Sequence, residues 1–260
     1  MLNWNFAPAY YTVNDADFEQ AFKTCINSPY ITSNPDYDAT AKSIRLAINK
    51  DDEDCDSINA AAGTDSEGNK IIIMNIGIMR WLSAMAIICT KLAAGESVSK
   101  CKKMLKWCGE RITHGKAGSD FIERFVSDFR IQMSGYDLET EHNYALAMTA
   151  TILGHEIGHL CLHHNGYDKQ INSSNRNFER QADMFSASLI QTNGASELTA
   201  VAAVMSLLSF KYIHGKHDKM DGQLSHPGTT ERINMMIESF RAQLEHSKIS
   251  PKVLRELGGI

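Results

Sequence analysis

The apolar positions of this chain recur mainly at three- and four-residue spacing, which is the period of amphipathic α-helices. Phenylalanines at positions 121, 125 and 129 show this spacing and are interpreted as core residues. Glycines or polar clusters end most of these stretches. The pattern predicts helices over residues 15–26, 39–48 and 78–92, two between 95 and 138, one containing 146–160, then 178–191, 198–213 and a last one ending near 246.

One region has a strand-like pattern instead. Residues 57–60 and 70–75 are short apolar stretches, the second rich in isoleucine, and a polar turn with Gly63 and Gly68 separates them. Such stretches predict two strands of a hairpin or meander. The expected fold class is therefore α+β, predominantly helical, with a small sheet beside the helices, in a single domain over residues 1–260.

The candidate chemistry lies within one predicted helix, in the sequence His-Glu-Ile-Gly-His at residues 155–159. Residues four apart lie on one face of an α-helix, so His155 and His159 can direct two imidazoles at one metal ion. Zn²⁺ favours imidazole ligands in catalytic sites. Glu156 lies beside His155, where its carboxylate can act as a general base on a water molecule. The motif therefore predicts a catalytic zinc site.

A catalytic zinc site usually has three protein ligands, so one more is expected. Glu179 follows His159 by 20 positions, enough for a loop and a return onto an adjacent helix. Asp183 is four residues further on and shares its face, where it can hydrogen-bond a ligand imidazole. We predict one Zn²⁺ per chain, held by His155, His159 and Glu179.

Two other histidines are rival ligands. His163 lies nearly on the face of His155, but too far along a straight helix to share the ion. His164 adjoins it, and the glycine turn that metzincins place before their third histidine is absent here. Both histidines are therefore weaker candidates than Glu179 for the third zinc ligand.

Composition and charge narrow the range of partners and cellular compartments that this protein can have. The net charge of −5 provides no basic footprint for a phosphate backbone, so no nucleic-acid partner is expected. The six cysteines form no Cys-x-x-Cys pair and no dense framework, which is typical of reduced thiols in a cytoplasmic protein.

No transmembrane segment is expected either. The N-terminus lacks a basic region followed by a long apolar region. The most apolar run, residues 71–90, is interrupted by Asn75, Gly77 and Arg80, which would be costly in a bilayer. The predicted location is the cytoplasm, or the periplasm if a signal peptide had been removed.

Four sequence blocks, in order, resemble the gluzincin zinc metallopeptidase family that includes HtpX, BepA and the CAAX prenyl endopeptidases. The family's transmembrane helices are absent here. Residues 95–143 also replace a short link of the family, so a helical insertion is expected at about 95–138. The blocks are residues 59–63 with 71–78, the motif at 155–159, Glu-Arg-Gln-Ala-Asp at 179–183, and Ser-His-Pro at 225–227 with Glu-Arg-Ile at 231–233.

The resemblance implies a zincin-type fold and endopeptidase activity on a protein or peptide substrate. An extended peptide is expected to bind by strand addition at Ile73, Met74 and Asn75. His226 is expected to act with Glu156, either by donating a hydrogen bond to the oxyanion or by occupying the zinc in a resting state. Arg232 is expected to support the site from outside the ligands, by anchoring the loop of His226 through an ion pair.

Two other interpretations fit the same residues. One is a cytosolic protease of the phage-exclusion (Lit-like) or ImmA type, which carries the same motif and cuts one specific protein. The other is a zinc-stabilised binding module without catalysis, although the presence of Glu156 favours an enzyme.

Overall fold

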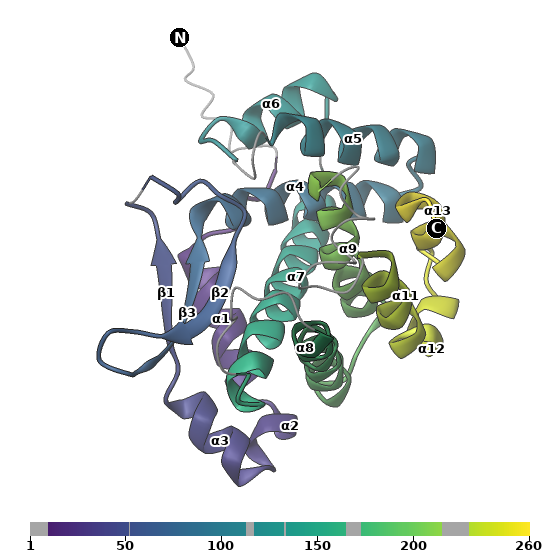
Figure 1. Cartoon of the computed structure of the whole chain (residues 1–260). Coiled ribbons are helices and arrows are strands. Elements are labelled where there is room, and N and C mark those ends of the chain that lie inside the picture. Colours follow the sequence, from purple (N-terminus) through teal and green to yellow (C-terminus); the bar gives the residue numbers. More distant parts are fainter. Residues whose placement is uncertain (1–9, 52, 113–116, 133, 165–172, 215–228) are drawn as a thin grey trace.

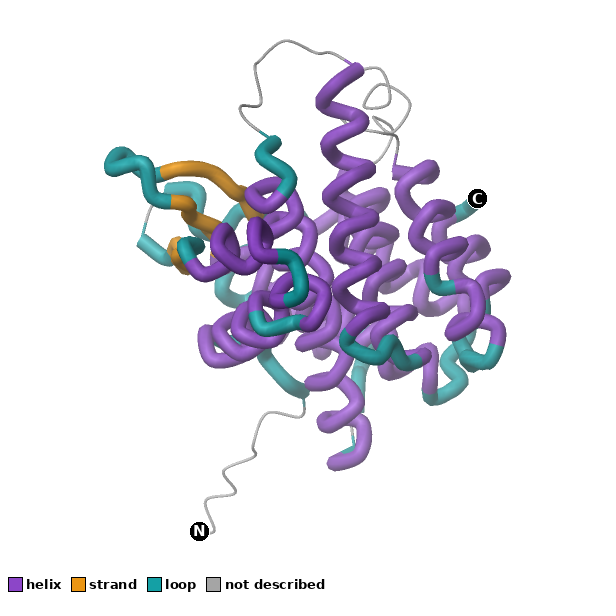
Figure 2. The backbone as a smooth tube through the Cα atoms, turned by 90° about the horizontal axis from the view of Figure 1, so that it is seen from below, coloured by secondary structure: helices purple, strands orange, loops and turns teal. Residues whose placement is uncertain are grey.

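The computed structural model describes residues 10–51, 53–112, 117–132, 134–164, 173–214 and 229–260. A long helix, α7 (Gly135–Cys161), runs through the middle of the molecule, and other helices surround it (Figure 1). A three-stranded sheet lies to one side of the helices, as a perpendicular view also shows (Figure 2). The predicted class, a predominantly helical α+β fold, is confirmed.

Local capping signals explain where several helices begin. Before α1 (Asp15–Ile26), the side chain of Asn14 accepts a hydrogen bond from the backbone, and Asp17 accepts one from the backbone of Asn14. Before α5 (Val98–Arg111), the Ser97 hydroxyl oxygen accepts a hydrogen bond from the Lys100 N–H. The other helices are α2 (Pro29–Thr32), α3 (Pro35–Lys42), α4 (Ile76–Ala93), α6 (Phe121–Asp128), α8 (Ser173–Thr192), α9 (Glu197–His214), α11 (Thr229–Ser239), α12 (Arg241–Glu245) and α13 (Pro251–Gly258).

The sheet has the strand order β1-β3-β2. β1 (Arg45–Asn49) runs parallel to β3 (Lys70–Asn75), and β2 (Ala60–Thr64) runs antiparallel to it. β2 and β3 are the predicted hairpin, although β2 begins where its predicted strand was to end. The helix predicted over 39–48 is wrong in its second half, because α3 ends at Lys42 and β1 follows. Leu46 and Ile48 alternate with smaller or polar neighbours there, which is the period of a strand.

Helix α4 forms part of the core. Among the described helices it is the one long and apolar enough to cross a membrane, and 78% of its 18-residue window is buried inside the molecule. Its Trp81 is fully buried and donates a hydrogen bond from Nε1 to Ser209 Oγ of α9 at 3.0 Å. The apolar side chains of this helix are thus covered by the rest of the protein.

The two helices predicted between residues 95 and 138 are α5 and α6. Phe121 and Phe125 are buried, and their rings lie 5.8 and 5.6 Å from the ring of Trp107. The core role predicted for these phenylalanines is thus confirmed for Phe121 and Phe125, whereas Phe129 is half-buried and packs against the core. The next helix, α7, begins at Gly135, because Ser134 and Asp137 form a capping box there.

Candidate metal centre

Helix α7 brings the two motif histidines together. Leu153 and Ile157, between and beside them, are fully buried and hold that side of the helix in the core. His155 and His159 lie on the face towards α8, with ring centroids 4.7 Å apart and Nε2 atoms 3.1 Å apart. His159 is only 4% exposed, so its imidazole depends on protein groups rather than on water for its hydrogen bonds.

Two glycines allow α8 to approach this face closely. A Cβ atom on Gly158 would lie 3.0–3.2 Å from the side chain of Phe185, and one on Gly154 would lie 2.9 Å from Ser186 Oγ. Ser186 in turn donates a hydrogen bond to the Thr151 carbonyl at 2.8 Å. The glycines are four residues apart, so they form a flat strip along α7 on which α8 rests.

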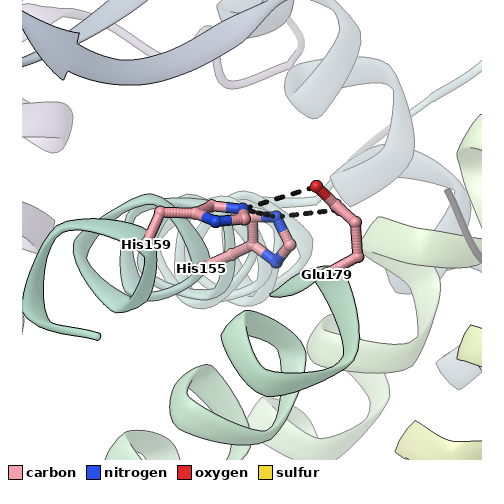
Figure 3. A group of neighbouring side chains, drawn as sticks. All are labelled: His155, His159 and Glu179. Carbon is pink, nitrogen blue, oxygen red and sulfur yellow. Dashed lines mark hydrogen bonds and ion pairs between the residues drawn. The ribbon is translucent and has the colours of Figure 1, made fainter. Parts of the chain in front are cut away.

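Glu179 of α8 completes a group of three donors. Its Oε2 lies 3.4 Å from His155 Nε2, and its Oε1 lies 3.5 Å from His159 Nε2. Figure 3 shows the three side chains converging from the two helices. A tetrahedral zinc ion with bonds of about 2.0–2.2 Å separates its ligand atoms by about 3.3–3.6 Å. The two nitrogen–oxygen separations, 3.4 and 3.5 Å to different oxygens of the carboxylate, lie within this range, and the nitrogen–nitrogen separation of 3.1 Å is slightly shorter. The three side chains therefore converge at close to the spacing of zinc ligands.

Asp183 and Arg232 support the group from behind. Asp183 Oδ1 lies 2.9 Å from His155 Nδ1, the ring nitrogen turned away from the donor cluster. Arg232 of α11 donates from Nε and Nη2 to the two oxygens of Asp183, both at 2.7 Å, and Nη2 lies 3.6 Å from Glu179. Burial would raise the pKa of Asp183, but Arg232 and His155 outweigh it and lower that pKa. The carboxylate is thus held ionised as an acceptor for His155.

The surroundings of His155 favour positive charge. Burial alone would lower the pKa of its imidazole, but hydrogen bonds with Asp183 and Glu179 raise it to about 10. The two carboxylates therefore more than offset the cost of placing a cation in this buried position. A site with this electrostatic bias suits a divalent metal ion.

His164 and Gln181 also belong to the centre, and the sequence did not identify their position. His164 Nδ1 lies 2.9 Å from His159 Nδ1, and His164 Nε2 lies 2.9 Å from Gln181 Oε1. His164 is thus placed behind a motif histidine rather than within the donor group. Helical spacing could not predict this, because α7 ends at Cys161 and the chain turns at His163, whose φ is +54°.

Glu156 opens onto a cavity of about 540 Å³ beside the donor group. The walls combine the edge strand β2, the motif helix and apolar side chains of α4, α9 and α11, among them Ile78, Leu207 and Met236. Glu156 is 9% exposed, so its carboxylate meets a mostly enclosed space. The cavity provides room for part of a substrate next to the histidines.

The structure corrects the predicted peptide-binding strand. β3 is the central strand, paired with β1 on one edge and β2 on the other, so residues 73–75 have no free edge for strand addition. Met74 is fully buried, and Asn75 donates hydrogen bonds to the Asp54 carbonyl and to Ser57 Oγ. Ile73 is 39% exposed, but its backbone pairs with both neighbouring strands. β2, which lines the cavity, is the edge strand on this side.

The remaining predicted residue, His226, lies outside the described residues, as does the Ser-His-Pro loop that contains it. Arg232 was expected to anchor that loop. Within the described part of the chain, Arg232 forms ion pairs with Asp183 and Glu179.

The comparison with family models identifies the family. The model named Peptidase U49 matches residues 94–251, which is more than half of the chain and includes all of α7 and α8. The chain belongs to the Peptidase U49 family. No curated protein and no solved structure matches it. The family makes this chain a peptidase with a protein or peptide substrate, and the match to the U49 model includes α5 and α6 as well as the donor group.

Proposed function

We propose that this U49 peptidase is a zinc-dependent endopeptidase with a zincin-type fold, related to the gluzincins. One observation carries the proposal: the Nε2 atoms of His155 and His159 and the carboxylate of Glu179 converge, with separations of 3.1, 3.4 and 3.5 Å that are close to those between the ligands of tetrahedral zinc. Three protein ligands leave a fourth position for water or substrate, which is typical of catalytic rather than structural zinc. Asp183 behind His155 is the kind of outer partner that zinc-bound histidines commonly have.

The residues around the donors suit peptide hydrolysis. When bound, zinc would acidify a water molecule and polarise the scissile carbonyl. Glu156 would take a proton from the attacking water and deliver it to the leaving amine. The low exposure of the site strengthens the electrostatic effect of each of these groups. His226 remains a proposed additional donor to the oxyanion.

For the substrate, we propose an extended peptide paired with the edge strand β2. A peptide at this edge gains backbone hydrogen bonds independent of its sequence. The apolar residues of the adjoining cavity, including Ile152 and Phe210, provide a place for one substrate side chain.

We also propose a cytoplasmic location. All six cysteines are free, and five of them are buried. Free thiols in this number are typical of a reducing compartment.

The test compares wild type with Glu156→Gln. Zinc content is measured by mass spectrometry, and a cell lysate is searched for new protein N-termini after incubation with each protein. We expect one zinc per chain in both, and roughly 10²–10⁴-fold slower cleavage by the variant, because only the general base is lost. Glu139→Gln, the same change at an exposed position of α7, is the matched control and should cleave normally.

Wild type that binds no zinc but still cleaves would overturn the metal mechanism. Equal cleavage by wild type and Glu156→Gln would remove Glu156 from its role. Zinc binding without new N-termini in either sample would favour the binding module.

A further inference from the structure

A hydrogen-bonded row of three side chains leads from the donor group to the surface. His159 Nδ1 lies 2.9 Å from His164 Nδ1, and His164 Nε2 lies 2.9 Å from Gln181 Oε1. The ring of His164 also stacks on Phe178 of α8, with centroids 4.4 Å apart and an interplanar angle of 22°. His164 is therefore held on three sides, and Gln181 at the end of the row is exposed.

The protons of this row have two consistent arrangements when both rings are neutral. In the first, the Gln181 oxygen accepts from His164 Nε2–H, His164 Nδ1 accepts from His159 Nδ1–H, and His159 Nε2 carries a lone pair. In the second, the Gln181 amide group donates, every bond reverses, and His159 Nε2 carries the proton. Only the first arrangement leaves His159 Nε2 free to bind a metal ion, since a ligand nitrogen must be unprotonated.

We propose that His164 and Gln181 are a positioning pair that fixes His159 in the tautomer needed for zinc binding. The pair acts through His159 and touches neither the metal position nor the substrate cavity, whose lining contains neither residue. The amide oxygen of Gln181 accepts a hydrogen bond from His164 Nε2–H. His164 Nδ1 is then unprotonated and accepts from His159 Nδ1–H. The proposal rests on the zinc function proposed above.

The two motif histidines are thus held by different chemistry. His155 has the carboxylate of Asp183, which is itself paired with Arg232. His159 has a neutral imidazole backed by a neutral amide. A carboxylate adds negative charge as well as orientation, whereas a neutral pair contributes orientation and tautomer alone. The expected effect of losing His164 is therefore on the tautomer of His159 and on zinc affinity.

The experiment measures zinc affinity by competition with a chromophoric chelator, in the full chain carrying Glu156→Gln so that no self-cleavage interferes. In this background, His164→Phe keeps an aromatic ring against Phe178 but removes the acceptor. We expect it to weaken zinc binding about 10–100-fold, the usual effect of losing an outer partner of a metal ligand. Gln181→Met should weaken zinc binding less, because His164 Nδ1 can still accept from His159 Nδ1–H whenever the His164 proton is on Nε2.

His163→Asn is the matched control, since His163 is exposed and asparagine tolerates its left-handed backbone. Its zinc affinity should equal that of the background protein. His164→Gln restores an acceptor oxygen and should recover part of the affinity lost in His164→Phe. Long-range ¹⁵N–¹H spectra of histidine-labelled protein provide the second readout, and they should show His159 protonated on Nδ1 in the background protein and a mixture of tautomers in His164→Phe.

The outcomes separate the two proposals. If the background protein binds no zinc, the proposed function fails. If it binds zinc, and His164→Phe binds it equally tightly with His159 in the same tautomer, the positioning role of His164 is refuted while the zinc site stands. An affinity loss in His164→Phe that His164→Gln does not recover at all would also refute it, because the acceptor would then not be the cause.

Discussion

The two ends of helix α7 bury acidic groups in opposite electrostatic states. Near its start, Glu141 is fully buried; one oxygen accepts from the Tyr11 N–H, and the other has no hydrogen-bond partner in the described part of the chain. Burial raises its pKa to about 8, against smaller lowering effects of that hydrogen bond and of Lys91. Against the other end, Asp183 is 1% exposed, yet Arg232 and His155 keep its pKa below the usual value.

This difference shows that burial alone does not mark a functional acid. A buried carboxyl without a close ion pair takes up a proton and becomes a neutral core group. A buried carboxylate that receives two bonds from Arg232 stays charged and can hold a ligand histidine. Charged side chains that are buried, ion-paired and directed towards the same position are characteristic of a functional site.

The largest expected effect comes from removing a donor at the charged end. Glu179→Gln replaces a carboxylate ligand by a neutral amide, and zinc affinity should fall by more than the roughly 10–100-fold expected for an outer partner. Asp183→Asn, which changes such a partner, should show the smaller loss. Chelator competition measures both. Unchanged affinity in Glu179→Gln would exclude it as the third ligand.

The next effect is on the free energy of unfolding, and it comes from the ion pairs of Arg232 with Asp183 and Glu179. Arg232→Met leaves two buried carboxylates without their cation, and breaking a buried pair from one side costs about 3–5 kcal/mol. Urea unfolding of the metal-free protein measures this loss. Arg124→Met, which removes an exposed pair with Asp120, is the control and should cost at most about 1 kcal/mol.

The pH dependence of that stability has a definite sign. Because folding lowers the pKa of Asp183, its contribution is complete above its unfolded-state pKa and is lost as the pH falls below it. Wild type should therefore lose stability on acidification more steeply than Arg232→Met. Parallel pH profiles of the two proteins would contradict the ionised state of Asp183.

The last expected effect concerns Glu141 at the neutral end of α7, and its pH dependence has the opposite sign. Folding raises the pKa of Glu141, so its stabilising contribution is present below the unfolded pKa of about 4.3 and is lost as the pH rises towards 8. Glu141→Gln keeps an acceptor for Tyr11 and removes this titration. Relative to wild type, it should gain stability with rising pH by up to about 1.4 kcal/mol per unit.

Thermal and urea unfolding between pH 5 and 8 would measure this gain, with the exposed Glu139→Gln as control. A Glu141→Gln variant with the pH profile of wild type would show that Glu141 is ionised in the folded protein at all these values.

Local periodicity predicted the elements that form within a short stretch of chain. The motif helix, the helix of Glu179 and Asp183, and the core role of Phe121 and Phe125 all follow from three- and four-residue spacing. The convergence of Glu179 on the two histidines was predicted because a ligand set needs a third member, and the close approach of α8 onto Gly154 and Gly158 makes it possible.

Features that depend on contacts between distant segments were missed. The strand β1 is five residues long and pairs with a strand 26 positions later, so local pattern could not place it or make β3 central. The role of His164 depends on a backbone turn after α7 and on Gln181 across the helix interface. Such arrangements come from tertiary packing, and sequence spacing does not encode them visibly.

The most direct test of the account is a crystal of the zinc-loaded protein, with diffraction recorded on both sides of the zinc absorption edge. The predicted result is one anomalous peak per chain, about 2.0–2.2 Å from His155 Nε2, His159 Nε2 and a carboxylate oxygen of Glu179. A protein loaded with zinc that shows no peak at these three atoms, or shows its peak at other side chains, would contradict the central claim.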